Sequence, residues 1–295
     1  MTTRLWIETP FTTVSIRTLS LALALTLGTV AHGQEPKKPF EPTSGQAGKD
    51  VVWVPSTAGM VNKMLAMAKV TPDDFVMDLG SGDGRNIIAA AKLGARALGV
   101  EFNPDMVALS RQRAAEAGVA DKAQFVEGDM YAADISKANV LALFLLPVNL
   151  NRLMPKFLEM APGSRIAGNT FGIDDWDPDD RFMLEEGADC TSFCEALLWI
   201  VPAKAAGTWT MANGSMTLTQ KFQMIQGSIT TGDGTHAIGS PALKGVDLSF
   251  IAGGLIYTGK ITGNQIEGTT TTPSGQVSWR ASRQVMVARA FPWQP

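Results

Sequence analysis

The stretch Phe-Val-Met-Asp-Leu-Gly-Ser-Gly-Asp-Gly at residues 75–84, with Glu101 downstream, constrains the fold of this chain more than any other feature. Its apolar start predicts a strand, and its alternating glycines predict a sharp turn that lets a ligand approach the backbone closely. A helical pattern at 87–93 and a second apolar run follow, and that run ends in Glu101. This order is typical of a doubly wound α/β fold, whose ligands bind at the carboxyl ends of parallel strands. An acid in that position is placed to hydrogen-bond a ribose diol.

The spacing of the glycines separates two kinds of nucleotide site. A dinucleotide site reads G-x-G-x-x-G/A, and counted from Gly80 its third small residue would be Arg85, which is too large. The spacing here is G-x-G-x-G with Asp78 two residues upstream. It resembles motif I of the Rossmann-like methyltransferases that use S-adenosylmethionine (SAM), and Gly128-Asp129 fits the same pattern. A glycine turn without a ligand is the alternative, but it leaves the acids at consecutive strand ends unexplained.

Strand and helix patterns alternate through the first part of the chain, and residues 51–204 are therefore predicted as one α/β domain. We expect a doubly wound, mostly parallel, seven-strand Rossmann-like sheet. From residue 205 to 289 short alternating runs separated by Asn-Gly and Gly-Asp-Gly turns predict a small antiparallel β domain, a barrel or a sandwich, of about seven strands. That domain offers no catalytic cluster, so we expect a structural or docking role. The individual strands predicted for the first domain are 75–79, 97–101, 123–127, 140–145, 165–169 and 197–201.

The N-terminus has the pattern of a secretory signal peptide. Arg17 precedes an uncharged run, and Ala31 and Gly33 close it with small residues, so residues 1–33 are predicted to be removed on export. Residues 34–50 are then a polar linker, the protein is periplasmic, and no stable membrane span remains after cleavage. A membrane anchor and a buried helix are alternatives, and the protein is cytoplasmic if this segment is not a functional signal.

Composition excludes some partners and leaves the cysteines open. The net charge is −3 with no basic run, which argues against nucleic-acid binding because that binding needs clustered cations. Cys190 and Cys194 would lie roughly 13 Å apart on one extended strand, beyond bridging range. A turn between them would change that, but two unpaired thiols are the favoured expectation. With His32 and His236 as the chain's two histidines, no zinc or other metal site is expected.

Further motifs narrow the resemblance. Val54-Pro-Ser56, 78–85, Gly99-Val-Glu-Phe-Asn103, Gly128-Asp-Met130, Leu143-Phe-Leu-Leu-Pro147 and Trp176-Asp-Pro-Asp179 resemble the small seven-strand lysine methyltransferases. Archaeal broad-range enzymes and mitochondrial enzymes acting on the ATP-synthase c-subunit and the adenine nucleotide translocase belong to that group. The resemblance implies SAM as cofactor, with the Pro-Ser segment over its methionine end, the glycine loop and acid on its carboxypropyl and ribose parts, and Gly-Asp at adenine. The implied cofactor-binding residues are Pro55, Ser56, Asp78, Gly80, Ser81, Gly82, Gly84, Glu101, Phe102, Asn103, Asp129 and Met130.

The acceptor side of the site is less sharply defined. An apolar rim after the fourth predicted strand suits the alkyl stem of an ammonium, and the predicted channel residues are Phe144, Leu145, Leu146, Pro147 and Trp176. Asn169 stands where the family more often carries histidine, and Asp174 and Asp175 follow it with charge that would attract a cation. These three are the catalytic candidates, although the two acids also fit an ordinary solvated loop.

The motifs therefore predict a SAM-dependent methyltransferase, and the resemblance implies that it N-methylates lysine in proteins. No Asn/Asp-Pro-Pro-Tyr motif follows the fourth predicted strand, which argues against the DNA and glutamine-amide methyltransferases of that type. A methyltransferase of small amines or other small molecules is one alternative. An exported, non-catalytic module that binds SAM or a nucleoside is another, because SAM is made in the cytoplasm.

Overall fold

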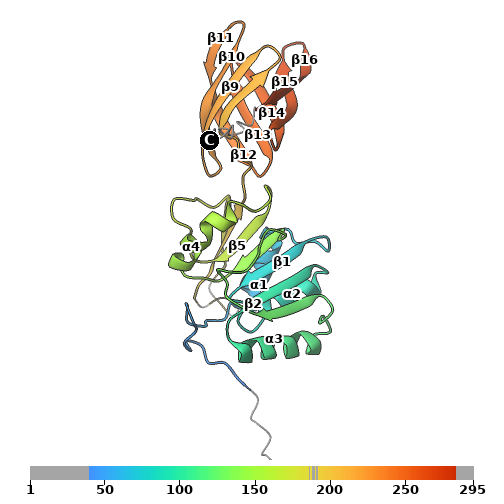
Figure 1. The fold of residues 1–295 in the computed structure, drawn as a ribbon, viewed down its shortest axis with the longest axis vertical. Helices are drawn as coiled ribbons and strands as arrows, with labels where there is room; N and C mark the ends of the chain where they lie inside the picture. The colour runs from blue at the N-terminus through green and yellow to red at the C-terminus, as the bar shows by residue number, and fades with distance from the viewer. Residues whose placement is uncertain (1–39, 186, 188–189, 191, 284–295) are drawn as a thin grey trace, which may run out of the picture. The chain divides into compact units, whose positions relative to one another are not determined.

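The computed structural model describes residues 40–185, 187, 190 and 192–283, and these residues form two separate β-sheets (Figure 1). The predicted signal peptide, residues 1–33, lies outside the described residues, as does the first part of the predicted linker.

The first sheet has seven strands in the order β3-β2-β1-β4-β5-β7-β6. The strands β1 to β5 run parallel, whereas β7 is antiparallel to both β5 and β6, so the sheet is mixed. The chain leaves β1 in one direction and returns beside it at β4, which creates a switch point where such sheets bind ligands. The strands are β1 (Phe75–Leu79), β2 (Arg96–Glu101), β3 (Ala123–Glu127), β4 (Val140–Leu143), β5 (Arg165–Asn169), β6 (Asp180–Met183) and β7 (Glu195–Ile200).

The strands predicted for this domain are all present, each within two residues of its expected ends. The exception among the seven is β6, which pattern reasoning did not predict. All four residues of β6 are exposed at the edge of the sheet. A strand without a buried face has no period-2 hydrophobic signal, and β6 is therefore invisible to a search for alternation.

Helices cover both faces of the first sheet. The helices α1 (Ala58–Met67), α2 (Arg85–Lys92) and α3 (Pro104–Glu116) share one apolar core with alternate strand residues such as Val76. The helix α4 (Pro147–Phe157) packs on the other face, against the core that contains Met77. Because successive side chains of a strand point to opposite faces, the neighbours Val76 and Met77 fall into different cores.

The second sheet is antiparallel, with the strand order β11-β10-β9-β8-β16-β15-β14-β13-β12. Its two edge strands, β11 and β12, follow one another in the chain with only Ile238 between them, so the edges approach and the sheet is barrel-like and nearly closed. The strands are β8 (Gly207–Met211), β9 (Gly214–Lys221), β10 (Met224–Thr231), β11 (Gly234–Ala237), β12 (Gly239–Lys244), β13 (Asp247–Ala252), β14 (Leu255–Thr262), β15 (Gln265–Thr272) and β16 (Gly275–Ser282).

The expectation of about seven strands in this sheet is wrong by two, because the sheet has nine. The strands without a sequence prediction are β11 and β12, both of which are mostly exposed. The remaining strands alternate buried and exposed residues around a core that includes Trp209, Phe250 and Ile266, and that alternation made them predictable.

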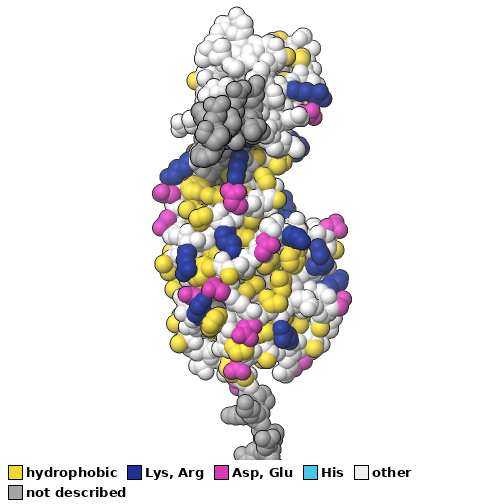
Figure 2. Space-filling model, in the orientation of Figure 1, with side chains coloured by type: hydrophobic (Ala, Val, Ile, Leu, Met, Phe, Trp, Pro, Cys, Tyr) yellow, Lys and Arg dark blue, Asp and Glu magenta, His cyan; other side chains and the backbone are white. Residues whose placement is uncertain are grey.

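The surface shows no field of one charge on the face drawn in Figure 2, where Lys and Arg side chains are interspersed with Asp and Glu. The side chains of the second sheet on that face are mostly neither charged nor hydrophobic. Among the described residues, no helix is long and apolar enough to cross a membrane.

Candidate functional site

A cavity of about 200 Å³ lies at the carboxyl ends of β1 to β4, at the switch point of the first sheet. The loop after each of these strands contributes to its wall, as expected for a ligand site in such a fold. Most of the predicted cofactor residues line it: Pro55, Ser56, Asp78, Gly80, Ser81, Gly82, Glu101, Phe102, Asn103, Asp129 and Met130. Of that predicted set, Gly84 lies outside the lining and instead precedes α2.

The glycine loop between β1 and α2 has a backbone that other residues adopt poorly. Gly80, Gly82 and Gly84 have φ angles of 76°, 55° and 82°, all in the left-handed region. Space is also short at Gly82, where an added Cβ would lie 2.6 Å from Nε1 of Trp53. The loop therefore requires glycine at this position for both conformation and room.

Glu101 ends β2 with its carboxylate held in place by the backbone. Oε2 accepts a hydrogen bond from the N–H of Gly82 at 2.9 Å, and Oε1 accepts one from the N–H of Asn103 at 2.9 Å. The side chain of Asn103 in turn accepts from the N–H of Asp105 and caps α3. A carboxylate has about four acceptor positions, so Glu101 keeps capacity for the hydroxyls of a ligand.

Asp78 is a buried carboxyl at the end of β1, next to Glu101. Nδ2 of Asn86 donates to its Oδ2 at 3.0 Å and also to the carbonyl of Ala142 at 3.3 Å. Burial raises the pKa of Asp78 to about 8, and the neighbouring charges of Glu101 and Asp83 add to the increase while the Asn86 hydrogen bond opposes it. Asp78 is therefore largely protonated at neutral pH in this state of the protein.

This raised pKa predicts how stability depends on pH. Between the pKa of an unfolded Asp and about 8, the folded protein binds the proton and the unfolded chain does not, so stability falls as pH rises. Relative to an Asp78→Asn variant, the wild type should lose roughly 1.4 kcal/mol of unfolding free energy per pH unit across this window. Urea unfolding of both proteins at pH 5, 6.5 and 8 measures the difference. Parallel pH dependence of the two proteins would show that Asp78 ionises normally.

Asp83 and Arg85 organise the glycine loop, although the sequence reasoning assigned them no role. Asp83 is 1% exposed and accepts from Arg85 Nη2 at 2.6 Å and from Arg113 Nη1. Burial raises the pKa of Asp83, but the hydrogen bonds and charges of the two arginines outweigh burial and hold it below its usual value. Arg85 also donates to the carbonyl of Ser56, which ties the loop to the segment before α1.

Residues 46–53, partly within the predicted linker, form another wall of the cavity. Two backbone hydrogen bonds close this segment into a loop: the N–H of Trp53 donates to the carbonyl of Gln46 at 3.0 Å, and the N–H of Gly45 donates to the carbonyl of Trp53 at 2.8 Å. Lys49 Nζ lies 2.6 Å from Asp129 Oδ2 and 4.8 Å from the ring centroid of Phe102. The hydrogen bond from Lys49 is the main reason why the pKa of Asp129 is lowered. Because its composition is polar, this segment was predicted in part as a linker, and its place in the cavity wall was not predicted.

The opposite end of the cavity is apolar. Three predicted channel residues, Phe144, Leu145 and Leu146, line it, and so do Phe171 and Phe193, which sequence reasoning missed. The ring of Phe144 lies 6.0 Å from that of Phe171 and 5.3 Å from that of Phe193, centroid to centroid. The three phenylalanines lie in different loops, far apart in the sequence, so no local pattern joins them.

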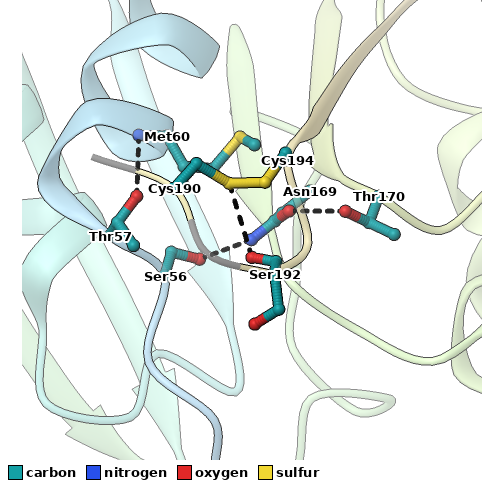
Figure 3. The surroundings of a disulfide bond; sticks show 8 residues. All are labelled: Ser56, Thr57, Met60, Asn169, Thr170, Cys190, Ser192 and Cys194. Carbon is teal, nitrogen blue, oxygen red and sulfur yellow. Dashed lines mark hydrogen bonds between the residues drawn. A yellow bond between two sulfur atoms is a disulfide. The ribbon is translucent and has the colours of Figure 1, made fainter. Parts of the chain in front are cut away.

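Asn169 contacts the cavity lining through a neighbour, Ser56. It is buried, its Nδ2 donates to Ser56 Oγ at 3.0 Å, and its Oδ1 accepts from the Thr170 hydroxyl at 3.0 Å (Figure 3). Asn169 does not itself line the cavity, whereas Ser56 does. The arrangement makes Asn169 a positioning residue for Ser56.

Four further predicted residues lie outside the cavity lining: Pro147, Asp174, Asp175 and Trp176. The placement of Trp176 in a substrate channel is corrected, because its side chain is 1% exposed within the core beneath α4. Pro147 starts α4, where its missing N–H costs nothing. Asp174 and Asp175 are exposed, which agrees with the solvated-loop alternative.

The expectation of two unpaired cysteines is wrong, because Cys190 and Cys194 form a disulfide beside Asn169 (Figure 3). Their Cα atoms are 5.6 Å apart, since the chain turns before β7 instead of running extended. Within that turn Phe193 has a φ of 60°. The extended geometry assumed from the sequence does not apply to this segment.

Comparisons with known proteins identify several methyltransferases that this chain resembles. The model of the ANTKMT methyltransferase domain matches residues 78–180. A protein-lysine N-methyltransferase of Saccharolobus islandicus is 39% identical over 141 residues, which are 46% of this chain and 87% of the relative. The adenine nucleotide translocase lysine N-methyltransferase of Mus musculus is 33% identical, and the match covers 47% of this chain and 60% of that enzyme. Among solved structures, an RNA methyltransferase from Salinibacter ruber in complex with S-adenosyl-L-homocysteine has 39% identity, a TM-score of 0.48 and coverage of 51% of this chain and 95% of its own.

The fold and the cavity define a Rossmann-like methyltransferase, with the glycine loop and the acids of β1 and β2 at the switch point of its sheet. Since the archaeal relative is 39% identical and is matched over 87% of its length, the chain belongs to the protein-lysine N-methyltransferase family. The second, antiparallel sheet lies beyond the region that the family model matches.

Proposed function

We propose that this protein transfers a methyl group from SAM to the side-chain nitrogen of lysine in another protein. The observation that carries the proposal is Glu101, whose carboxylate is fixed by the N–H groups of Gly82 and Asn103 at the rim of the cavity. A carboxylate held in this way binds a ribose diol without a further loss of side-chain entropy. SAM is the cofactor of this methyltransferase domain.

Further residues of the cavity fit SAM. The absence of a side chain at Gly82 lets the indole of Trp53 lie directly against the glycine loop, and both residues line the cavity. Asp129 and Met130 would then lie on the adenine side.

Bound SAM supplies an electrophilic methyl group with its own leaving group, so the protein has mainly to hold and align the acceptor. A lysine ammonium must first lose a proton to expose its lone pair, and solvent can accept it. Asn169 cannot serve as that base, because a carboxamide does not accept a proton at neutral pH. Its hydrogen bond to Ser56 Oγ supports a role in positioning Ser56, where the site would hold the methionine end of SAM.

The two alternatives from the sequence have less support. The relatives that define the family are named for lysine in proteins and not for small amines. A non-catalytic module would not need a complete set of acids and glycines around the cavity, yet Asp78, Gly82, Glu101 and Asp129 all line it.

Substitution of Glu101 tests the cofactor assignment. Glu101→Ala should weaken SAM binding by roughly 1–3 kcal/mol, since it removes charge-assisted hydrogen bonds to the ribose. Isothermal titration with SAM and S-adenosylhomocysteine measures the loss. Glu127→Ala is the matched control, because Glu127 ends the neighbouring strand in register with Glu101 but is exposed and outside the cavity lining. Equal affinities in the two variants would refute the role of Glu101.

The acceptor class needs its own experiment. Purified protein with isotopically labelled SAM is offered a lysine-rich protein or, in parallel, butylamine and putrescine. The proposal requires methyl-lysine in the hydrolysed protein acceptor and little transfer to the small amines. The reverse pattern would assign the enzyme to small molecules instead.

We further propose that the protein is exported before it works. The tripartite pattern of residues 1–33 supports this, and a disulfide such as Cys190–Cys194 persists mainly in oxidising compartments. Mass spectrometry of protein from the native host should find the N-terminus near Gln34. Uncleaved protein in the cytoplasmic fraction would refute export and would place the enzyme where SAM is made.

A further inference from the structure

The apolar end of the cavity is built from three phenylalanine rings that contact one another. The centroid distances are 6.0 Å for Phe144–Phe171, 5.3 Å for Phe144–Phe193 and 5.8 Å for Phe171–Phe193. All three side chains line the cavity, and each remains partly open, with Phe193 being 38% exposed. The cluster is therefore part of the site wall and not part of the closed core.

The sheet explains why these rings meet. Phe144 directly follows β4, Phe171 comes two residues after β5, and Phe193 comes two residues before β7. The strands β4, β5 and β7 are neighbours, and β7 runs antiparallel to β5. The start of β7 consequently lies at the same edge as the ends of β4 and β5, which brings the three rings together beside the cavity.

We propose that Phe144, Phe171 and Phe193 form an aromatic pocket that surrounds the acceptor nitrogen and binds the cation that methyl transfer creates there, and that the Cys190–Cys194 disulfide holds Phe193 in it. The proposal rests on the methyltransferase function proposed above and adds the residues and the ligand chemistry of its acceptor side. Cations bind aromatic faces within about 6 Å of the ring centroid. Because the three centroids are no more than 6.0 Å apart, one cation beside the cluster is within reach of every ring.

Methyl transfer creates positive charge on the acceptor nitrogen, which is where such a pocket would lie. The lone pair of the deprotonated amine forms the new N–C bond, the S–C bond of the sulfonium breaks, and sulfur keeps the electron pair. Positive charge therefore moves from sulfur to nitrogen during transfer. Aromatic faces at the acceptor nitrogen attract this charge more strongly in the transition state than in the neutral amine, which is the condition for catalysis.

The disulfide bears on the third ring. Phe193 lies inside the short loop that the Cys190–Cys194 bond closes, immediately before Cys194. Its φ of 60° is a left-handed conformation that a non-glycine residue keeps only when its surroundings enforce it. Cys190 is 0% exposed and so anchors the loop in the interior. Opening the bond removes this constraint and lets Phe193 leave the other two rings.

The test compares two peptides on the full chain. One carries a single Nε-trimethyllysine, and the other carries its neutral isostere, in which carbon replaces the quaternary nitrogen. The wild type in its oxidised form should bind the charged peptide about tenfold more tightly than the isostere by isothermal titration. Equal affinity for the two peptides would overturn the proposal, because shape alone would then account for binding.

Variants locate the effect. In Phe193→Ala the preference for the charged peptide should fall to about twofold or less, whereas Phe193→Tyr should retain it. Phe182→Ala is the matched control, because Phe182 is 44% exposed but lies outside the cavity lining. A preference that survives in Phe193→Ala would show that this ring does not hold the cation.

The role of the disulfide is read in the same assay. Reduction of the wild type with a phosphine, and the Cys190→Ser/Cys194→Ser variant, should both reduce the preference to the level of Phe193→Ala. An undiminished preference in both would overturn the bracing role of the bond. SAM affinity is measured on every sample, so a protein that does not bind SAM at all would indicate failure of the proposed function and not of the aromatic pocket.

Discussion

Gly82→Val should abolish SAM binding. The valine Cβ would lie 2.6 Å from Nε1 and 2.9 Å from Cδ1 of Trp53, and real Cβ atoms do not approach other atoms so closely. Position 82 also has a φ of 55°, which is an outlier for a β-branched residue. Either the loop or the segment 46–53 must move, and both form the cavity. Titration with SAM should show a loss of at least about 100-fold, or more than about 2.7 kcal/mol.

A second glycine, Gly118, separates the two expected causes of the loss, which are backbone strain and the collision with Trp53. Gly118 has a φ of 68°, so a valine there suffers similar backbone strain, but its Cβ would meet nothing within 4 Å. Gly118→Val should therefore lose some stability and keep SAM affinity. In addition, Trp53→Ala should restore part of the binding to Gly82→Val because it removes the collision. Normal SAM affinity in Gly82→Val would mean that the loop does not contact the cofactor.

The features predicted well from the sequence are those built by residues that are close along the chain and also meet in the folded site. The glycine loop, Glu101 and Asn103 are such a case, because strand, turn and helix signals follow one another and the sheet brings only adjacent loops together. Burial alternation located most strands for the same reason. Local pattern therefore sufficed for the part of the site that one βαβ unit builds.

The features that were missed depend on contacts between distant segments or on an irregular backbone. Phe171 and Phe193 meet Phe144 because β4, β5 and β7 are neighbouring strands. The order of strands in a sheet cannot be read from a short stretch of sequence. Lys49 and Trp53 lie in or beside a stretch whose polar composition is that of a linker, yet they meet Asp129 and Gly82 across the cavity. The disulfide was disfavoured because the distance between the cysteines was taken from an extended strand, and that distance does not hold in a turn.

Asp83 should be among the most important single residues for stability. It is 1% exposed and receives charged hydrogen bonds from Arg85 and Arg113, so Asp83→Ala leaves both guanidinium groups without their anion. Removing one partner of a fully buried ion pair costs about 3–5 kcal/mol. We expect a smaller loss here, about 2–3 kcal/mol, because the arginine side chains are 35% and 40% exposed and water can still screen them. Urea unfolding at pH 7 measures the change.

The pH dependence of that loss tests its electrostatic origin. The pKa of Asp83 is lowered in the folded protein, so its ionised form contributes stability above the unfolded pKa, and the contribution disappears as pH falls through the folded value. The difference between the wild type and Asp83→Ala should thus shrink as the pH approaches about 3. Asp121→Ala, at an exposed position, is the control and should change stability by less than about 0.5 kcal/mol. A stability deficit in Asp83→Ala that stayed constant over the same pH range would point to lost packing instead.

Asp83→Ala also frees Arg85 from the glycine loop. Because Arg85 donates to the carbonyl of Ser56 as well, the SAM affinity of this variant should fall together with its stability.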